Sequence, residues 1–183
     1  MRALDVVITV QDGEVNALMR AADAATTPAS FAKFHYAFTS PYMRSKARDR
    51  FRSQGDEASG RWAPLRDATE EIRENAGFPG ASPINKRTGG LEAYITGRPG
   101  EVTVTPVDSA LFFPARPTSR AEVEKLKTAQ QGKPGGTPLF GGAQGMGAPT
   151  PPRPVAAMDA TDLIHTMSAL QIHVAAEIAA RMR

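Results

Sequence analysis

The sequence of 183 residues contains no cysteine. Disulfide bridges and thiolate metal sites are therefore excluded, and the chain is compatible with a reducing compartment. It also lacks the run of about 18 uncharged apolar residues that a membrane-spanning helix needs. Its first ten residues, MRALDVVITV, have neither the long apolar core nor the small-residue cleavage site of a signal peptide. We therefore expect a soluble protein that does not enter a membrane.

The common catalytic and cofactor-binding motifs are missing as well. His165 and His173 lie eight residues apart without the HExxH arrangement, and no G-x-S-x-G sequence occurs. Lys133 is followed by Pro134, where a phosphate-binding loop needs serine or threonine. The glycines between 141 and 147 do not form G-x-G-x-x-G, and the acidic residues of 66–75 are expected to face solvent. We therefore expect a non-enzyme with no catalytic, cofactor-binding or metal-binding residues and no cofactor.

Glycine and proline are abundant, with 16 and 15 copies. The length is that of one ordinary domain, so residues 1–183 are expected to form a single domain around a modest core. Residues 115–153 are expected to be a flexible loop insertion, regular only in a short helix over 119–131. Apolar residues inside this loop, together with its lysines, are candidate anchors for docking on another subunit: Leu139, Phe140 and Met146.

Positive charge is concentrated locally. The chain has 22 Lys+Arg against 19 Asp+Glu, a net charge of +3, and residues 116–153 hold more of the basic excess than the rest. Two basic groups are candidate binding residues, one in this loop and one on a helix over 41–54 at a spacing of four: Lys125, Lys127 and Lys133, and Arg44, Arg48 and Arg52. They form either a solvated face or a contact with nucleic acid or an acidic partner.

The first half of the chain reads as a strand followed by helices. Residues 4–10 alternate as in a strand, and Asp12 can begin a helix whose apolar stripe is Val15, Leu18, Met19 and Ala22. Phenylalanines recur at helical spacing from Ser30 onward. Ser40 and Pro41 then predict a new helix, with the serine as its cap, that runs to about Gln54.

The second half predicts a hairpin and a terminal helix. Residues 66–75 form a short helix capped by Asp67, and 101–107 and 109–113 are strands that pair antiparallel. Asp159 caps the last helix, with Met158 and Leu163 placed as a hydrophobic staple. The expected fold class is α+β, a small antiparallel sheet packed by N-terminal helices and a long C-terminal amphipathic helix.

The terminal helix is apolar on two sides. One stripe contains Leu163, Met167, Leu170, Val174 and Ile178, and the other side contains Ile172, Ala175, Ala176 and Ala179. Such a helix either lies deep in its own domain or packs its second face against another subunit. The small size of the chain favours the second, which makes Ile172 and Ala176 candidate interface residues.

The only tryptophan lies in GRWAPLRDATEEIREN, residues 60–75, between a polar loop and a charged helix. Pro64 fixes the backbone there, so Trp62 and Leu65 can fold back and bury their side chains on the sheet or helix pair. Contact of Trp62 with a neighbouring subunit is the alternative.

Several segments follow one another in a familiar order: RF at 50–51, GRWAPL at 60–65, Thr69, Arg73, PINKRTGGLEAYITG at 83–97 and RPV at 153–155. Over residues 40–183 this order resembles the tail-completion and virion-morphogenesis family of tailed phages, which includes the Mu-type morphogenesis protein. In that family a W-x-P-L segment follows the Arg-Phe helix, a "tG-L" turn enters the sheet, and an Arg-Pro element precedes the last helix. This chain has SALFFPARPTSR where the family carries a Tyr-Ala, His, Phe-Gly pattern. Either Arg116 or Arg153 can therefore hold the Arg-Pro position, and the capped helix that follows favours Arg153.

The resemblance implies a structural virion protein that forms a ring, expected to be hexameric, at the neck or the head-proximal end of the tail. There it would complete the tail, as a terminator does, and join it to the head after assembly in the host cytoplasm. Its partners would be its own copies and neighbouring neck and tail-tube proteins, with DNA only as passing cargo. A head-to-tail stopper or adaptor is the nearest alternative. A nucleic-acid-binding protein that uses the basic helix and loop is another.

Overall fold

The computed structural model describes residues 12–56, 60–78, 89–131, 137–138, 146–147, 153 and 156–183. The strand expected over 4–10 lies outside these residues. The elements, in chain order, are α1 (Asp12–Ala25), α2 (Pro28–Phe34), a π-helical turn (His35–Thr39), α3 (Ser40–Ser53), β1 (Gly55–Asp56), β2 (Gly60–Arg61), α4 (Asp67–Asn75), α5 (Gly90–Gly97), β3 (Glu101–Val104), β4 (Ser109–Phe112), α6 (Arg120–Gln131), β5 (Thr137–Pro138), β6 (Met146–Gly147) and α7 (Ala160–Arg181). Helices with small antiparallel pairs of strands confirm the α+β class.

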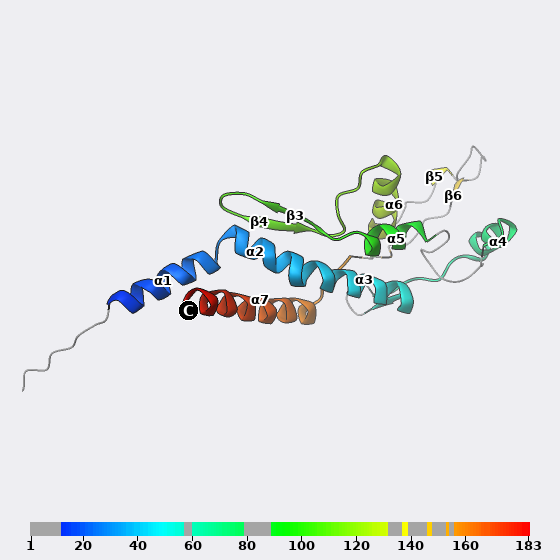
Figure 1. The fold of residues 1–183 in the computed structure, drawn as a ribbon. Coiled ribbons are helices and arrows are strands. Elements are labelled where there is room, and N and C mark those ends of the chain that lie inside the picture. Colours follow the sequence, from blue (N-terminus) through cyan, green and yellow to red (C-terminus); the bar gives the residue numbers. More distant parts are fainter. Residues whose placement is uncertain are drawn as a thin grey trace, which may run out of the picture.

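A long helical rod forms the centre of the molecule. Figure 1 shows α2, the π-helical turn and α3 running on as one rod, with α7 along one side and the β3–β4 hairpin along the other. Thr27 caps the start of α2, where its hydroxyl accepts a hydrogen bond from the Ser30 amide, and Pro28 occupies the first turn. Helix α1 packs along the C-terminal helix.

The predicted restart of the helix at Ser40 is wrong. Ser40 has helical backbone angles, and its amide donates to the carbonyl of His35, so the chain passes from α2 into α3 through a wide turn. Proline has no N–H to donate, and a π-helical turn accommodates the resulting gap in the hydrogen-bond ladder without ending the helix. The Ser40 hydroxyl instead accepts a buried hydrogen bond from the Gly100 amide, at 2.8 Å.

The end of α3 brings the tryptophan segment back onto the helix. Gln54 and Gly55 both have positive φ, and the β1–β2 pair closes when the Trp62 amide donates to the Gln54 carbonyl at 2.8 Å. A Cβ at Gly55 would lie 2.2 Å from the Gly60 carbonyl oxygen. Only glycine therefore fits this return.

The hairpin expected around 101–113 is confirmed. Strands β3 and β4 pair antiparallel from Glu101 opposite Phe112 to Val104 opposite Ser109, and the hairpin packs on α2. The segment before the hairpin was expected to be a turn that enters the sheet. This expectation is wrong, because residues 90–97 form helix α5. The cap predicted at Asp67 is also wrong, since Arg66 is the N-cap of α4 and makes no side-chain capping bond.

The apolar core lies between α3, the tryptophan segment, α5 and α6. Its buried members are Ala47, Phe51, Trp62, Tyr94, Ile95 and Ala129. The rings of Phe51 and Trp62 meet edge to face, with centroids 5.4 Å apart. Leu126 and Ala129 come from α6, so the first part of the segment expected to be a flexible loop is helical and packed on this core. Residues 132–136, 139–145 and 148–152 lie outside the described residues.

Candidate interaction surface and its anchor

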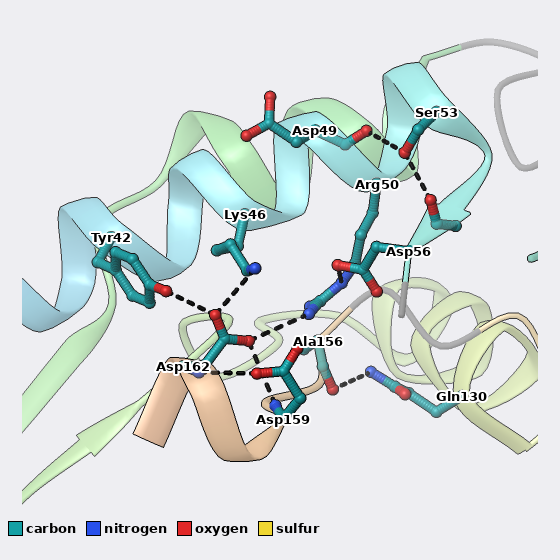
Figure 2. A network of polar contacts seen from close by, with 11 residues as sticks. Tyr42, Lys46, Asp49, Arg50, Ser53, Asp56, Gln130, Ala156, Asp159 and Asp162 are labelled. Carbon is teal, nitrogen blue, oxygen red and sulfur yellow. Dashed lines mark hydrogen bonds and ion pairs between the residues drawn. The ribbon is translucent and has the colours of Figure 1, made fainter. Parts of the chain in front are cut away.

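A buried ionic cluster anchors the start of α7 to α3. Asp162 is 1% exposed and accepts a hydrogen bond from the Tyr42 hydroxyl at 2.5 Å. The Lys46 ammonium lies 2.9 Å from the same carboxylate oxygen, and the Arg50 guanidinium lies 3.8 Å from the other. Figure 2 shows the three α3 side chains, one turn apart, directed at this carboxylate. We call Tyr42, Lys46, Arg50 and Asp162 the α7 anchor.

Asp162 also belongs to the cap of its own helix. The Asp159 side chain accepts from the Asp162 amide at 2.7 Å, and the Asp162 side chain accepts from the Asp159 amide, which makes a reciprocal capping box. Burial alone would raise the pKa of Asp162. The hydrogen bonds from Tyr42, Lys46 and the Asp159 amide outweigh burial and hold that pKa below the usual aspartate range. The carboxylate is therefore ionised at neutral pH.

The three α3 side chains of the anchor are also affected by burial and by their contacts with carboxylates. The hydrogen bond from Lys46 to Asp162 raises the pKa of Lys46, and burial together with a separate hydrogen bond to Asp162 raises the pKa of Tyr42. Arg50 is fully buried and pairs with Asp56 at 2.6 Å. Two carboxylates thus compensate the charge of the buried guanidinium. A buried charge needs such compensation because the interior has low polarity.

Aromatic and histidine rings continue the contact between α7 and the rod. Phe34, Phe38 and Tyr42 stack in sequence with centroids 5.4 and 5.6 Å apart. His165 lies against Phe38 and Tyr42, and His173 lies against Phe34. His173 Nε2 is also within 3.2 Å of the Ser30 hydroxyl. The two histidines therefore pack α7 onto the rod.

A second buried arginine holds the tryptophan segment. Arg153 donates from Nε to the Ala63 carbonyl at 3.0 Å and from an Nη to the Pro64 carbonyl at 3.2 Å. Its amide donates to the Ala129 carbonyl, and burial lowers the pKa of its guanidinium. Trp62 is 3% exposed and Leu65 packs on the same core. Arg116, by contrast, is exposed and stacks on the Phe112 ring, so of these two arginines it is Arg153 that contacts the W-x-P-L segment.

The basic candidates do not form one patch. Arg44 donates to the Thr96 carbonyl at 3.0 Å, and Arg48 lies 3.5 Å from the same oxygen, so both serve the C-terminal end of α5. Arg52 is exposed and pairs with Asp49. Lys125 and Lys127 are exposed on α6, whereas Lys133 lies outside the described residues.

The outward side of α7 is apolar and exposed. Ile164, Met167 and Met182 are 67%, 49% and 45% exposed, and between Asp162 and Glu177 the helix carries no Asp, Glu, Lys or Arg. Ile172 and Ala176, predicted as interface residues, are exposed as well. So are the predicted staple residues Met158 and Leu163. Leu139, Phe140 and the side chain of Met146 lie outside the described residues.

Helix α1 adds exposed apolar residues of its own. Its buried contacts are made by Ala21 and Ala25, whereas the large members of its predicted stripe are exposed: Val15, Leu18 and Met19. The small side chains of α1 are thus buried, and its bulky apolar side chains are exposed to solvent. An exposed apolar area of this kind is typical of a surface that binds another protein.

Within the described residues, no group of three or more His, Cys, Asp or Glu side chains could hold a metal ion. The helices of the described ranges are all too short or too polar to cross a membrane. Comparison with family models, with curated proteins and with solved structures finds no match.

Sequence reasoning missed the α7 anchor, although two signals for it are present. Asp162 follows the capping Asp159 by three residues, the spacing of a capping box. Tyr42, Lys46 and Arg50 recur every four residues and so share one face of α3. Sequence alone does not place these two patterns against each other.

Proposed function

We propose that this chain is a structural virion protein of a tailed phage, one copy in a ring at the neck or the head-proximal end of the tail. The observation that carries the proposal is the terminal helix. It is fixed to the rod by a buried ionic anchor, yet its outer side is apolar, uncharged and exposed. Depletion of charge with exposed large apolar side chains is typical of the centre of a protein interface.

The resemblance in sequence supplies the proposed location in the particle, and several of its motif residues have structural roles in the fold. The Arg-Phe pair contributes the buried Arg50 and Phe51, and the W-x-P-L segment is held by Arg153. Phe51 and the W-x-P-L segment therefore belong to the apolar core, and Arg50 belongs to the α7 anchor. A ring needs two different complementary surfaces on each subunit. The exposed apolar residues of α1 and the β3–β4 hairpin offer two such surfaces, which leaves the outer side of α7 for a further contact.

The test is to make phage particles without this chain and to add the purified protein back. Free heads and free tails that join when the protein is added support the proposal, and gold-labelled antibody should mark the neck of the joined particles. Tails of uncontrolled length would indicate a terminator, and heads that lose their DNA would indicate a stopper or adaptor. Infectious particles of normal form made without the chain would refute the proposal.

The nucleic-acid alternative has less support, because Arg44 and Arg48 are engaged with the Thr96 carbonyl. Titration of duplex DNA at rising salt tests it directly. Tight binding that weakens steeply with salt, and that is lost in Lys125→Ala/Lys127→Ala, would favour the alternative over a purely structural role.

A further inference from the structure

One side of α7 contains a seam that is symmetric about Gln171 and is exposed except at its last member, Ile178, which is half-buried. Ile164 and Ile178 each lie seven residues from Gln171, and Met167 and Ala175 each lie four residues from it. At 3.6 residues per turn these five side chains share one side of the helix. Asp162 and His173, which contact the rod, lie on the opposite side. We call Ile164, Met167, Gln171, Ala175 and Ile178 the α7 seam.

We propose that a second copy of this chain covers the α7 seam, with the two α7 helices antiparallel and related by a two-fold axis at Gln171. A two-fold contact uses the same patch on both partners, so it requires a patch that complements itself when reversed. The seam meets this requirement because reversal places Ile164 on Ile178 and Met167 on Ala175. A large side chain then faces a small one, which allows close packing.

Charge at the two ends of the helix favours the same arrangement. Asp159 caps the N-terminal end of α7, and Arg181 and Arg183 lie at its C-terminal end, so an antiparallel partner brings the acidic end of one helix toward the basic end of the other. The helix dipoles of the two copies also oppose each other in this orientation. A parallel pairing would instead place Asp159 beside Asp159 and Arg183 beside Arg183.

Gln171 gives the pairing its register. It is exposed in the single chain and is the polar residue at the middle of an otherwise apolar seam. A glutamine amide carries both a donor and an acceptor, so two copies can hydrogen-bond to each other across the axis. A single polar residue in an apolar helix seam fixes register and orientation, because any shift leaves the amides unpaired.

This inference does not depend on the neck assignment, and the absence of cysteine makes it directly testable with the full-length chain. Facing residues of helices packed about 8–10 Å apart come within disulfide range. Under mild oxidation, Gln171→Cys should form a covalent dimer. Ile164→Cys should form none with itself, but should cross-link when mixed with Ile178→Cys. Self-linking of Ile164→Cys would demonstrate a parallel pair and overturn the proposal.

Sedimentation of the uncross-linked protein provides the second measurement. The wild type should dimerise, and Ile164→Glu should weaken the dimer roughly tenfold or more because it places a charge in the seam. Ile72 on α4 is exposed as well, at 54% against 67% for Ile164, so the matched Ile72→Glu should leave the dissociation constant unchanged. A wild type that stays monomeric overturns the proposal, as does a dimer or ring that Ile164→Glu leaves intact.

Discussion

Helix α3 meets the tryptophan segment and α5 through apolar side chains, and it holds α7 through ions. On the first side, Ala47 and Phe51 pack on Trp62 and Ile95. On the other, Tyr42, Lys46 and Arg50 converge on the buried Asp162 (Figure 2). The first contact is non-directional and scales with buried area, whereas the second requires defined distances and angles.

The difference indicates a division of roles within one small domain. Replacing a buried ion cluster by apolar residues is often neutral for stability, so such clusters are weak evidence of stabilisation, and one hypothesis for their presence is that they specify geometry. We infer that the apolar side supplies most of the free energy of folding. The ionic side sets the position of α7, whose outer seam must be presented in one orientation to bind a partner.

The largest effect is expected from Trp62→Ala on the apolar side. Removal of a buried aromatic side chain typically costs about 3–5 kcal/mol, a large part of the stability of one domain. Urea unfolding followed by circular dichroism should show this loss. Val107→Ala is the matched control, because Val107 is 89% exposed and its truncation should change little. An unchanged midpoint for Trp62→Ala would mean that the indole does not contribute to the folded core.

The second-largest loss of stability is expected from Asp162→Ala, at about 2–3 kcal/mol. This is below the usual range for breaking a buried pair, since Lys46 is part-exposed and Arg50 retains Asp56. Hydrogen exchange locates the effect: amides of α7 should lose protection while those of α5 and α6 keep it. Equal loss of protection in all three helices would contradict separate roles for the two sides.

The sequence predicts much of the structure on the apolar side of α3 and little of it on the ionic side. The hairpin, the first helix, the terminal helix with its cap and the burial of Trp62 were predicted, because periodicity and capping residues are local signals. The convergence of α3 residues on Asp162 was not predicted, because Asp162 is more than a hundred residues away from them in the sequence. The same limit explains the error at Ser40, where a distant Gly100 amide uses the serine hydroxyl that a local rule assigned to a cap.

The pH dependence of the stability lost in Asp162→Ala should report on the ionic side. The pKa of Asp162 is lower in the folded chain than in the unfolded one, where it is about 3.9. Its contribution is therefore complete above the unfolded pKa and is lost as the pH falls through the folded pKa. Lys46 has a raised pKa, so its contribution is complete below about 10.4 and is lost as the pH rises through the folded value.

These signs predict a gap in unfolding free energy between wild type and Asp162→Ala that is widest near neutral pH and narrows below about pH 4. Chemical denaturation at stepped pH measures it. The gap for Trp62→Ala should stay constant over the same range, because an indole does not titrate. A pH-independent gap for Asp162→Ala would show that the carboxylate contributes by packing and not by charge.

The smallest loss of stability is expected between the two sides of α3, where Arg44 and Arg48 reach the Thr96 carbonyl at the end of α5. A cation at a helix C-terminus contributes about 0.3–1 kcal/mol, so Arg44→Ala should lower stability by that amount. Arg52→Ala is the matched control on the same helix, because its exposed pair with Asp49 should contribute almost nothing. The loss at Arg44 should persist in high salt, since it includes a direct hydrogen bond that ionic screening does not remove. If the two variants lose the same stability and high salt abolishes both losses, the arginines act only through net charge. They would then be available to bind nucleic acid, and that alternative would gain support.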